Sequence, residues 1–183
     1  MMISRRQWMV GGAALATTLA AAPLVAKGLK PKPVGLQLYT VRELFSKDPM
    51  GTLEKVAKIG YREVEYGGGG YDKMDHAALR KTMDRLGLKS PSLHIGYEAL
   101  SGDFAGSVKM AKTLGADTVI LPYMTAEQRN AESWKAAVAN FNRWAEQLKK
   151  AGLDFAYHNH DFEFTTKPGG VSLYDMLLAD ADP

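Results

Sequence analysis

The feature that most constrains the fold is a glycine that recurs after each helix-like stretch and before each strand-like run. Gly60, Gly87, Gly115 and Gly152 hold this position, at spacings of 27, 28 and 37 residues. A glycine directly after the last helical turn adopts the left-handed conformation that ends many helices. The spacing matches one strand, one helix and two short loops. Alternation at this period predicts parallel strands with helices packed outside them, which is the α/β class.

Hydrophobic periodicity places five strands and five helices in alternation along the chain. The predicted strands cover residues 34–40, 62–66, 89–95, 117–122 and 154–160. The predicted helices cover residues 51–59, 75–86, 103–114, 132–151 and 171–179. Large apolar residues recur at helical spacing in the fourth helix and predict a buried stripe there, formed by Trp134, Phe141, Trp144 and Leu148.

Two architectures satisfy this alternation, an open doubly wound sheet and a closed (β/α)₈ barrel. No Gly-x-Gly-x-x-Gly motif follows the first strand, and we interpret the glycines at 67–70 as a flexible loop. Polar residues instead follow the carboxyl ends of successive strands, where such barrels build their active sites. These residues are Tyr39, Glu65, His94, Tyr123, His158, His160 and Glu163. We therefore predict a partial TIM barrel with about five of eight βα units and two open sheet edges.

The densest group of chemically active residues lies between residues 154 and 164. If residues 154–160 are extended, His158 and His160 point to the same side, because side chains alternate along a strand. Glu163 lies just beyond, where a loop can fold it back toward the same pocket. Two imidazoles and a carboxylate suit either a divalent metal or proton transfer near neutral pH. Both histidines could also be interior barrel residues that bond to neighbouring backbone groups.

The first 26 residues have the three-part layout of an export signal, with a basic head, a weakly apolar run and small residues at the end. Arg5 and Arg6, followed by Trp8 and Met9, resemble a twin-arginine signal. The alternatives are an ordinary secretory signal or an uncleaved anchor. We expect a linker at residues 27–33 and a barrel domain at residues 34–183. The protein should then be periplasmic and should meet the membrane only during export.

Composition excludes several classes of site. There is no cysteine, so neither disulfides nor thiolate metal sites are available. The formal charge of +3 falls to +1 when Arg5 and Arg6 leave with the signal. Basic residues are interspersed with acidic ones and form no basic stripe, which argues against nucleic acid as a partner.

Three motifs resemble the sugar phosphate isomerase/epimerase family with its xylose-isomerase-like barrel. They are residues 35–42 (GLQLYTVR), 60–65 (GYREVE) and 157–164 (YHNHDFEF), and the last is the most specific. The resemblance implies a carbohydrate substrate and a divalent Mn, Mg or Zn ion at the mouth of the barrel. Such an ion polarises a carbonyl and stabilises an enediolate while a carboxylate or histidine moves the proton. Family members take their metal ligands from strands five to eight, and this chain holds only the strand-five contribution.

Roles follow for seven residues under this resemblance. The metal ligand is His158 or Glu163, because the family's commoner glutamate is replaced by His158. Glu65 and His160 are candidates for catalysis, with a salt bridge as the alternative for Glu65. Tyr39, His94 and Asn159 are candidates for substrate binding; His94 could instead be structural, and Tyr39 and Tyr123 could simply rim the pocket.

The sequence therefore predicts a metal-dependent sugar isomerase or epimerase, as an incomplete chain that is inactive alone and binds metal weakly. The main alternative is a non-catalytic sugar-binding or partner-dependent fragment. Its open edges would be covered by another chain, which a homo-oligomer could supply. An apurinic-endonuclease-like barrel is a third alternative, disfavoured by the export signal and the lack of a basic stripe.

Overall fold

The computed structural model describes residues 33–182. The predicted export signal and almost all of the predicted linker lie outside the described residues. Within the described part, no helix is both long and apolar enough to cross a membrane.

All the strand pairs of the sheet are parallel, as predicted. β1 pairs with β2, and β3 with β4 and then β5. Two parallel bridges, Glu63 to Lys89 and Tyr66 to Leu93, connect the two groups, so the strands follow chain order. The strands are β1 (Gly35–Gln37), β2 (Glu63–Glu65), β3 (Ser92–His94), β4 (Thr118–Leu121) and β5 (Asp154–Tyr157). This is the arrangement of a partial TIM barrel, and the described residues do not close it.

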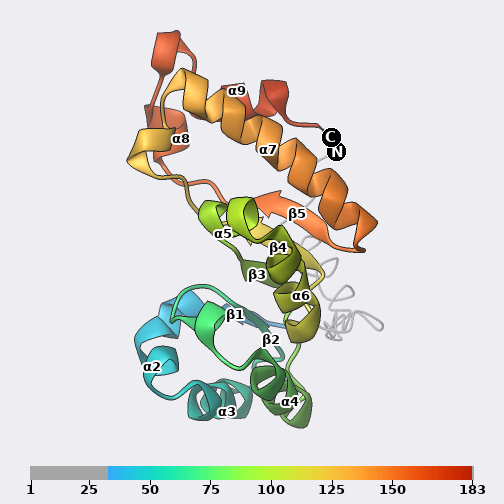
Figure 1. The fold of residues 1–183 in the computed structure, drawn as a ribbon. Helices are drawn as coiled ribbons and strands as arrows, with labels where there is room; N and C mark the ends of the chain where they lie inside the picture. The colour runs from blue at the N-terminus through green and yellow to red at the C-terminus, as the bar shows by residue number, and fades with distance from the viewer. Residues whose placement is uncertain (1–32, 183) are drawn as a thin grey trace, which may run out of the picture. The chain divides into compact units, whose positions relative to one another are not determined.

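Each predicted helix is present; the first four each lie between two strands in the chain, and the fifth packs beside α7 (Figure 1). They are α3 (Pro49–Ile59), α4 (His76–Leu86), α6 (Phe104–Leu114), α7 (Ala131–Lys150) and α9 (Leu173–Asp180). Three short helices were not predicted, because one or two turns are too short to show a helical period. These are α2 (Arg42–Lys47), α5 (Tyr97–Gly102) and α8 (Phe162–Thr165). Single 3₁₀ turns complete the connections: η1 (Leu38–Val41), η2 (Tyr71–Lys73), η3 (Ala126–Gln128) and η4 (Pro168–Gly170).

The recurring glycine does end the helices. Gly60, Gly87 and Gly115 are left-handed caps of α3, α4 and α6, with φ of 119°, 67° and 77°. At the fourth position Ala151 caps α7, and Gly152 follows with φ of 74°. The signal that starts each helix is also close in sequence. The side chains of Asp48, Asp75, Asp103 and Asn130 each accept a hydrogen bond from a backbone N–H in the first turn of α3, α4, α6 and α7, respectively.

All five strand predictions were too long; the third, predicted over residues 89–95, covers only Ser92–His94. The first strand, predicted over residues 34–40, ends at Gln37 because Leu38 begins a 3₁₀ turn. The last, predicted over residues 154–160, ends at Tyr157. Its neighbour β4 stops at Leu121, whose carbonyl accepts the last ladder bond from His158. His158, Asn159 and His160 therefore lie in irregular backbone.

The sheet has an apolar face toward the helices and a more polar face on the other side. Leu93 of β3 and Val119 of β4 are register partners and are buried, as is Val64 of β2. On α7 the predicted stripe is confirmed, since its four members are at most 3% exposed. One of them, Phe141, stacks on Tyr157 of β5 with ring centroids 5.4 Å apart. The opposite face carries the side chains of the candidate site.

Candidate functional site

A hollow of about 570 Å³ lies at the carboxyl ends of the strands. It collects residues that end, or closely follow, each of the five strands. Its lining is Gln37, Tyr39, Gly68, His94, Pro122, Tyr123, His158 and His160. Four residues that the sequence placed in the site, Tyr39, His94, His158 and His160, are thus brought together.

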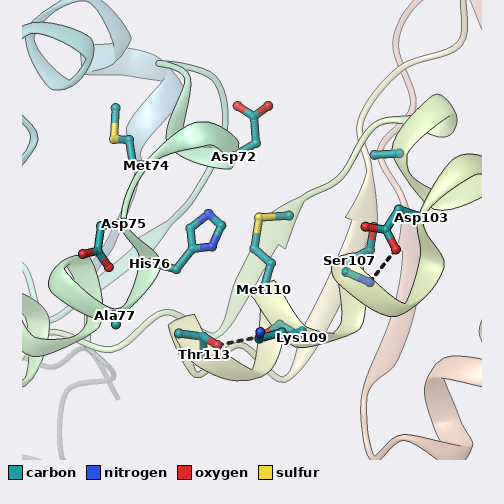
Figure 2. Close-up of a pocket in the computed structure, with 12 residues that line it drawn as sticks. Asp72, Met74, Asp75, His76, Ala77, Asp103, Ser107, Lys109, Met110 and Thr113 are labelled. Carbon is teal, nitrogen blue, oxygen red and sulfur yellow. Dashed lines mark hydrogen bonds between the residues drawn. The ribbon is translucent and has the colours of Figure 1, made fainter.

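A larger hollow of about 660 Å³ lies on the helix side, where His76 at the start of α4 and Met110 of α6 face one another (Figure 2). The carboxylates of Asp75 and Asp103 are occupied there as helix caps. None of the predicted site residues lines it. We therefore take the hollow at the strand ends as the candidate site.

The carboxylate of Glu65 joins three strands beneath the pocket. Gln37 on β1 donates from Nε2 to Oε1 at 2.6 Å, and Ser92 on β3 donates from its hydroxyl to Oε2. The Nε2 atom of His94 lies 3.0 Å from Oε1. That contact is short but not aligned as a hydrogen bond, since the buried Nε2 has no well-directed acceptor in the described part of the chain. A bare Nε2 would repel the carboxylate, so we assign the ring proton to Nε2.

These contacts hold Glu65 ionised. The interaction with His94 lowers the pKa of Glu65 most, Gln37 and Ser92 lower it further, and burial opposes them. The net result moves the pKa from 4.5 to about 2. A carboxylate with so low a pKa is a weak base near neutral pH, because efficient general bases have a pKa near the working pH. Glu65 is therefore suited to orient His94 and to supply negative charge, and poorly suited to take a proton itself.

The three imidazoles of the pocket form a continuous row. The edge of the His94 ring meets His158 with centroids 5.3 Å apart, and His158 stacks on His160 at 4.9 Å with an interplanar angle of 15°. The predicted common orientation of His158 and His160 is therefore present, although the strand ends before them. Tyr123 meets the His160 ring edge-on at 5.4 Å and borders the pocket.

His158 is held in its neutral form. Burial lowers its pKa below 6.5, and positive charge on His94 or His160 would lower it further. A neutral imidazole can accept a proton or a hydrogen bond, or bind a metal ion. Near neutral pH, His158 is thus available for the chemistry that the sequence predicted for this cluster.

Glu163 lies below the pocket and does not line it. It follows Phe162, the first residue of the short helix α8, and is 0% exposed. The hydroxyl of Tyr157 donates to its Oε1, and the backbone N–H of His160 donates to Oε2 at 2.6 Å. Burial first, and then Glu163, raise the pKa of Tyr157, so its hydroxyl keeps the proton that it donates. The carboxylate therefore fixes the backbone that carries His160.

The described residues do not fit a metal ion in this arrangement. Among residues 33–182, no three His, Cys, Asp or Glu side chains are grouped so as to hold one. The stacked rings of His158 and His160 are nearly parallel, so their nitrogen lone pairs do not converge on one point. Both oxygens of Glu163 already accept hydrogen bonds. The assignment of His158 or Glu163 as a metal ligand stays a prediction.

Two other predicted residues also lie outside the pocket lining. Asn159 is exposed, and Glu65 stands behind His94. Sequence reasoning missed Gln37 and Ser92 as site residues. The available signal was strand alternation, because Gln37 is the register partner of Glu65, and Ser92 is two residues before His94 on the same face.

Arg129 was also missed and supports the rim of the pocket. Its guanidinium carbon lies 3.5 Å from the centre of the Phe162 ring and 4.9 Å from that of Tyr123. Nε and Nη2 both donate to the carbonyl of Met124. Nothing in the local pattern around η3 distinguishes this arginine from a solvent-exposed one.

Comparison with known proteins identifies the fold. No protein-family model and no curated protein matches the chain. A sugar phosphate isomerase/epimerase from Parabacteroides distasonis is 25% identical with a TM-score of 0.69, over 89% of this chain and 66% of that one. A family 2 AP endonuclease from Brucella melitensis is 18% identical with a TM-score of 0.56, over 80% and 65%. A D-psicose 3-epimerase, solved in the presence of D-fructose, is 17% identical with a TM-score of 0.51, over 70% and 55%.

The chain thus spans about two thirds or less of the length of the structures that it resembles. These neighbours include sugar isomerase/epimerase and xylose-isomerase-like barrel proteins. They confirm the predicted fold class, an α/β partial barrel with parallel strands and outer helices.

Proposed function

We propose that this protein belongs to an isomerase or epimerase system that moves a proton on a sugar or sugar derivative. One observation carries the proposal: three adjacent imidazoles, backed by the ionised Glu65, line a hollow at the carboxyl ends of parallel strands. Active sites of (β/α)₈ barrels are built at this end. The fold likeness to a sugar phosphate isomerase/epimerase and to a D-psicose 3-epimerase supports the same general chemistry.

His160 is our candidate for the proton transfer. It would take a proton from the carbon beside a sugar carbonyl, and the electron pair of that C–H bond would form the enediolate. Return of the proton to the former carbonyl carbon, with the hydroxyl proton passing from one enediolate oxygen to the other, would complete an isomerisation. His160 Nδ1 is buried without a hydrogen-bond partner in the described residues, and a substrate hydroxyl could supply the missing bond.

His94 and Tyr39 are proposed to bind the sugar. Both line the pocket, and the His94 ring is in edge contact with that of His158. Glu65 acts through His94, because it is joined to that ring and not to the pocket space itself.

Metal dependence is a separate proposal that rests on the family resemblance. The described residues offer at most His158 and Glu163, and two ligands hold Mn²⁺ or Mg²⁺ poorly against water. Isothermal titration with Mn²⁺ should therefore detect no micromolar binding to this chain. Micromolar binding that is lost in His158→Ala would show that the chain builds a metal site on its own.

The decisive experiment is solvent exchange. The chain is incubated in D₂O with ketoses and oxidised sugars, with and without Mn²⁺, Mg²⁺ or Zn²⁺, and carbon-bound deuterium is followed by NMR. Exchange in wild type that falls about 100-fold or more in His160→Gln, and stays unchanged in His76→Gln, supports the proposal. His76 is the matched control, because it lies in the other hollow. If wild type shows no deuterium exchange and no sugar binding under any of these conditions, the proposal is refuted.

A second candidate is a non-catalytic sugar-binding or partner-dependent fragment. In residues 33–182, β1 pairs only with β2, and β5 only with β4, so each has one open edge. Sugar binding without deuterium exchange would favour this candidate. Size-exclusion chromatography with light scattering would show whether a second copy covers these edges.

We also propose export to the periplasm by the twin-arginine route, from residues 1–26. A reporter fused to residues 1–33 should be exported. Replacing Arg5 and Arg6 by lysine in this fusion should abolish the export. Export that persists would favour an ordinary secretory signal.

A further inference from the structure

The loop after β2 has a backbone that few residues other than glycine adopt. Gly68, Gly69 and Gly70 are consecutive and have φ of 68°, 70° and 75°. A β-carbon disfavours this left-handed region, so the run specifies its own conformation. Sequence analysis interpreted these glycines only as a source of flexibility.

The space around the loop gives a further reason for glycine at Gly68 and Gly69, and the only one at Gly67. A β-carbon on Gly67 would lie 3.1 Å from Nδ1 of His94. One on Gly68 would lie 2.7 Å from Cδ2 of Tyr39, and one on Gly69 would lie 3.0 Å from Cδ1 of Phe45. The separation at Gly68 is shorter than real β-carbons show, and those at Gly67 and Gly69 are tighter than nine in ten real β-carbon contacts, so the neighbouring ring would have to shift by a few tenths of an ångström.

Gly70 differs from its neighbours. It shares their left-handed φ, but a β-carbon there would meet nothing within 4 Å. A substitution at Gly70 would therefore introduce backbone strain without a new side-chain contact. Gly67 separates them in the opposite sense, because its φ is not positive and only the contact with His94 opposes a side chain.

Two of the three rings that lie against this loop, those of His94 and Tyr39, line the pocket. His94 is enclosed by Gly67 beside Nδ1, by Glu65 beside Nε2 and by the ring of His158. The hydroxyl of Tyr71, just after the loop, donates to the His94 carbonyl. Tyr39 has Gly68 at its ring edge and the guanidinium of Arg42 4.4 Å from its ring centre.

We infer that Gly67 and Gly68 are positioning residues of the pocket: their bare α-carbons set where the rings of His94 and Tyr39 stand. The loop is then a backbone template for the site. The structural inference stands on contacts alone, and only its binding consequence rests on the proposed sugar chemistry.

The test compares Gly67→Ala with Gly70→Ala in the full chain. With labelled histidine, the four ring signals of His76, His94, His158 and His160 can be followed by NMR. Gly67→Ala should shift the signals of His94 and His158 and leave His76 in place. Gly70→Ala should lower the melting temperature and leave all four in place. Equal shifts in both variants, or none in Gly67→Ala, would overturn the inference.

A second background covers the case in which Gly67→Ala fails to fold. The double variant Gly67→Ala/His94→Ala should melt at the same temperature as His94→Ala, because the ring that the added methyl meets is gone. Likewise, Gly68→Ala should melt below Gly70→Ala, and this excess should disappear in a Tyr39→Ala background. An equal loss with and without the ring would show that the loop does not contact it and would refute the inference.

A binding measurement connects the loop to the proposed function. If wild type binds D-fructose, Gly67→Ala should weaken that binding about tenfold or more, while Gly70→Ala should not change it. Absence of D-fructose binding in wild type counts against the proposed function. The positioning role of Gly67 is then tested by the ring signals and melting temperatures, which do not depend on a sugar.

Discussion

Glu65 and Glu163 are two carboxylates beneath the same pocket, yet they support it in different ways. Glu65 is 22% exposed and accepts from side chains of β1 and β3. Glu163 is 0% exposed and accepts from Tyr157 and from the backbone of His160, both within a few residues in the chain. Glu65 therefore fixes neighbouring strands and the charge next to His94. Glu163 fixes the turn that carries His160.

The difference shows that burial and donor identity decide the role of a carboxylate more than its distance from a histidine in sequence. Glu163 is three residues from His160, and its position suggested a metal ligand. Tertiary structure occupies both of its oxygens with local donors. Glu65 is 29 residues from His94, and the parallel register brings the two together.

The largest effect is expected for Glu163→Ala. The change leaves the Tyr157 hydroxyl and the His160 N–H without their acceptor, and each such loss costs about 1–3 kcal/mol. Urea denaturation should show a free energy of unfolding lower by at least about 2 kcal/mol. Asp161→Ala is the control, because Asp161 is exposed and two residues away. Equal losses in the two variants would contradict the role given to Glu163.

Compared with Glu163→Ala, Glu65→Gln should lower the free energy of unfolding less and the proposed exchange activity more. Gln can still accept from one neighbour, but the charge beside His94 is lost, at roughly 1.5–3 kcal/mol for hydrogen bonds to a charged group. If deuterium exchange is found, it should fall together with this loss. Glu63→Gln is the control on the same strand and face, two residues earlier. A Glu65→Gln variant with wild-type stability and exchange would show that the network is dispensable.

Acid stability should distinguish the wild type from Glu65→Gln. The pKa of Glu65 is lower in the folded protein than its ordinary 4.5, so the unfolded chain binds the proton more tightly. The stabilisation by Glu65 is then complete above about pH 4.5 and is lost as the pH falls toward about 2. Denaturation at several pH values should show a shallower loss over this range in Glu65→Gln. Identical pH slopes would mean that Glu65 titrates normally.

The smallest effect is expected for Arg129→Gln. The loss of cation–π contact with Phe162 and Tyr123 should cost about 0.5–2 kcal/mol. Thermal denaturation measures the change in the free energy of unfolding. Arg143 is exposed, so Arg143→Gln serves as the control and should stay within about 0.5 kcal/mol of wild type. A loss no larger than that of Arg143→Gln would place Arg129 with ordinary surface arginines.

Local chemistry made much of the fold predictable. Glycine after α3, α4 and α6, aspartate before them, and the apolar stripe of α7 act within a few residues of one another. The ends of β1 and β5 were not predictable, because a strand ends where its neighbour stops accepting bonds, as β4 does before Pro122. The short helices α2, α5 and α8 had no period long enough to detect.

For the site, the amino-acid pattern was enough to predict which residues follow the strands, and these include the three imidazoles that the structure brings into contact, His94, His158 and His160. The parallel order of the strands is enough to bring these residues to one end of the sheet, because it follows from a periodic and local pattern. It took the tertiary structure to show that Gln37 and Ser92 bind Glu65, that Glu163 is buried, and that little space is left for a β-carbon between residues 67–69 and the neighbouring rings. These outcomes depend on register and on ångström-scale packing between segments far apart in the chain, which no single stretch of sequence specifies.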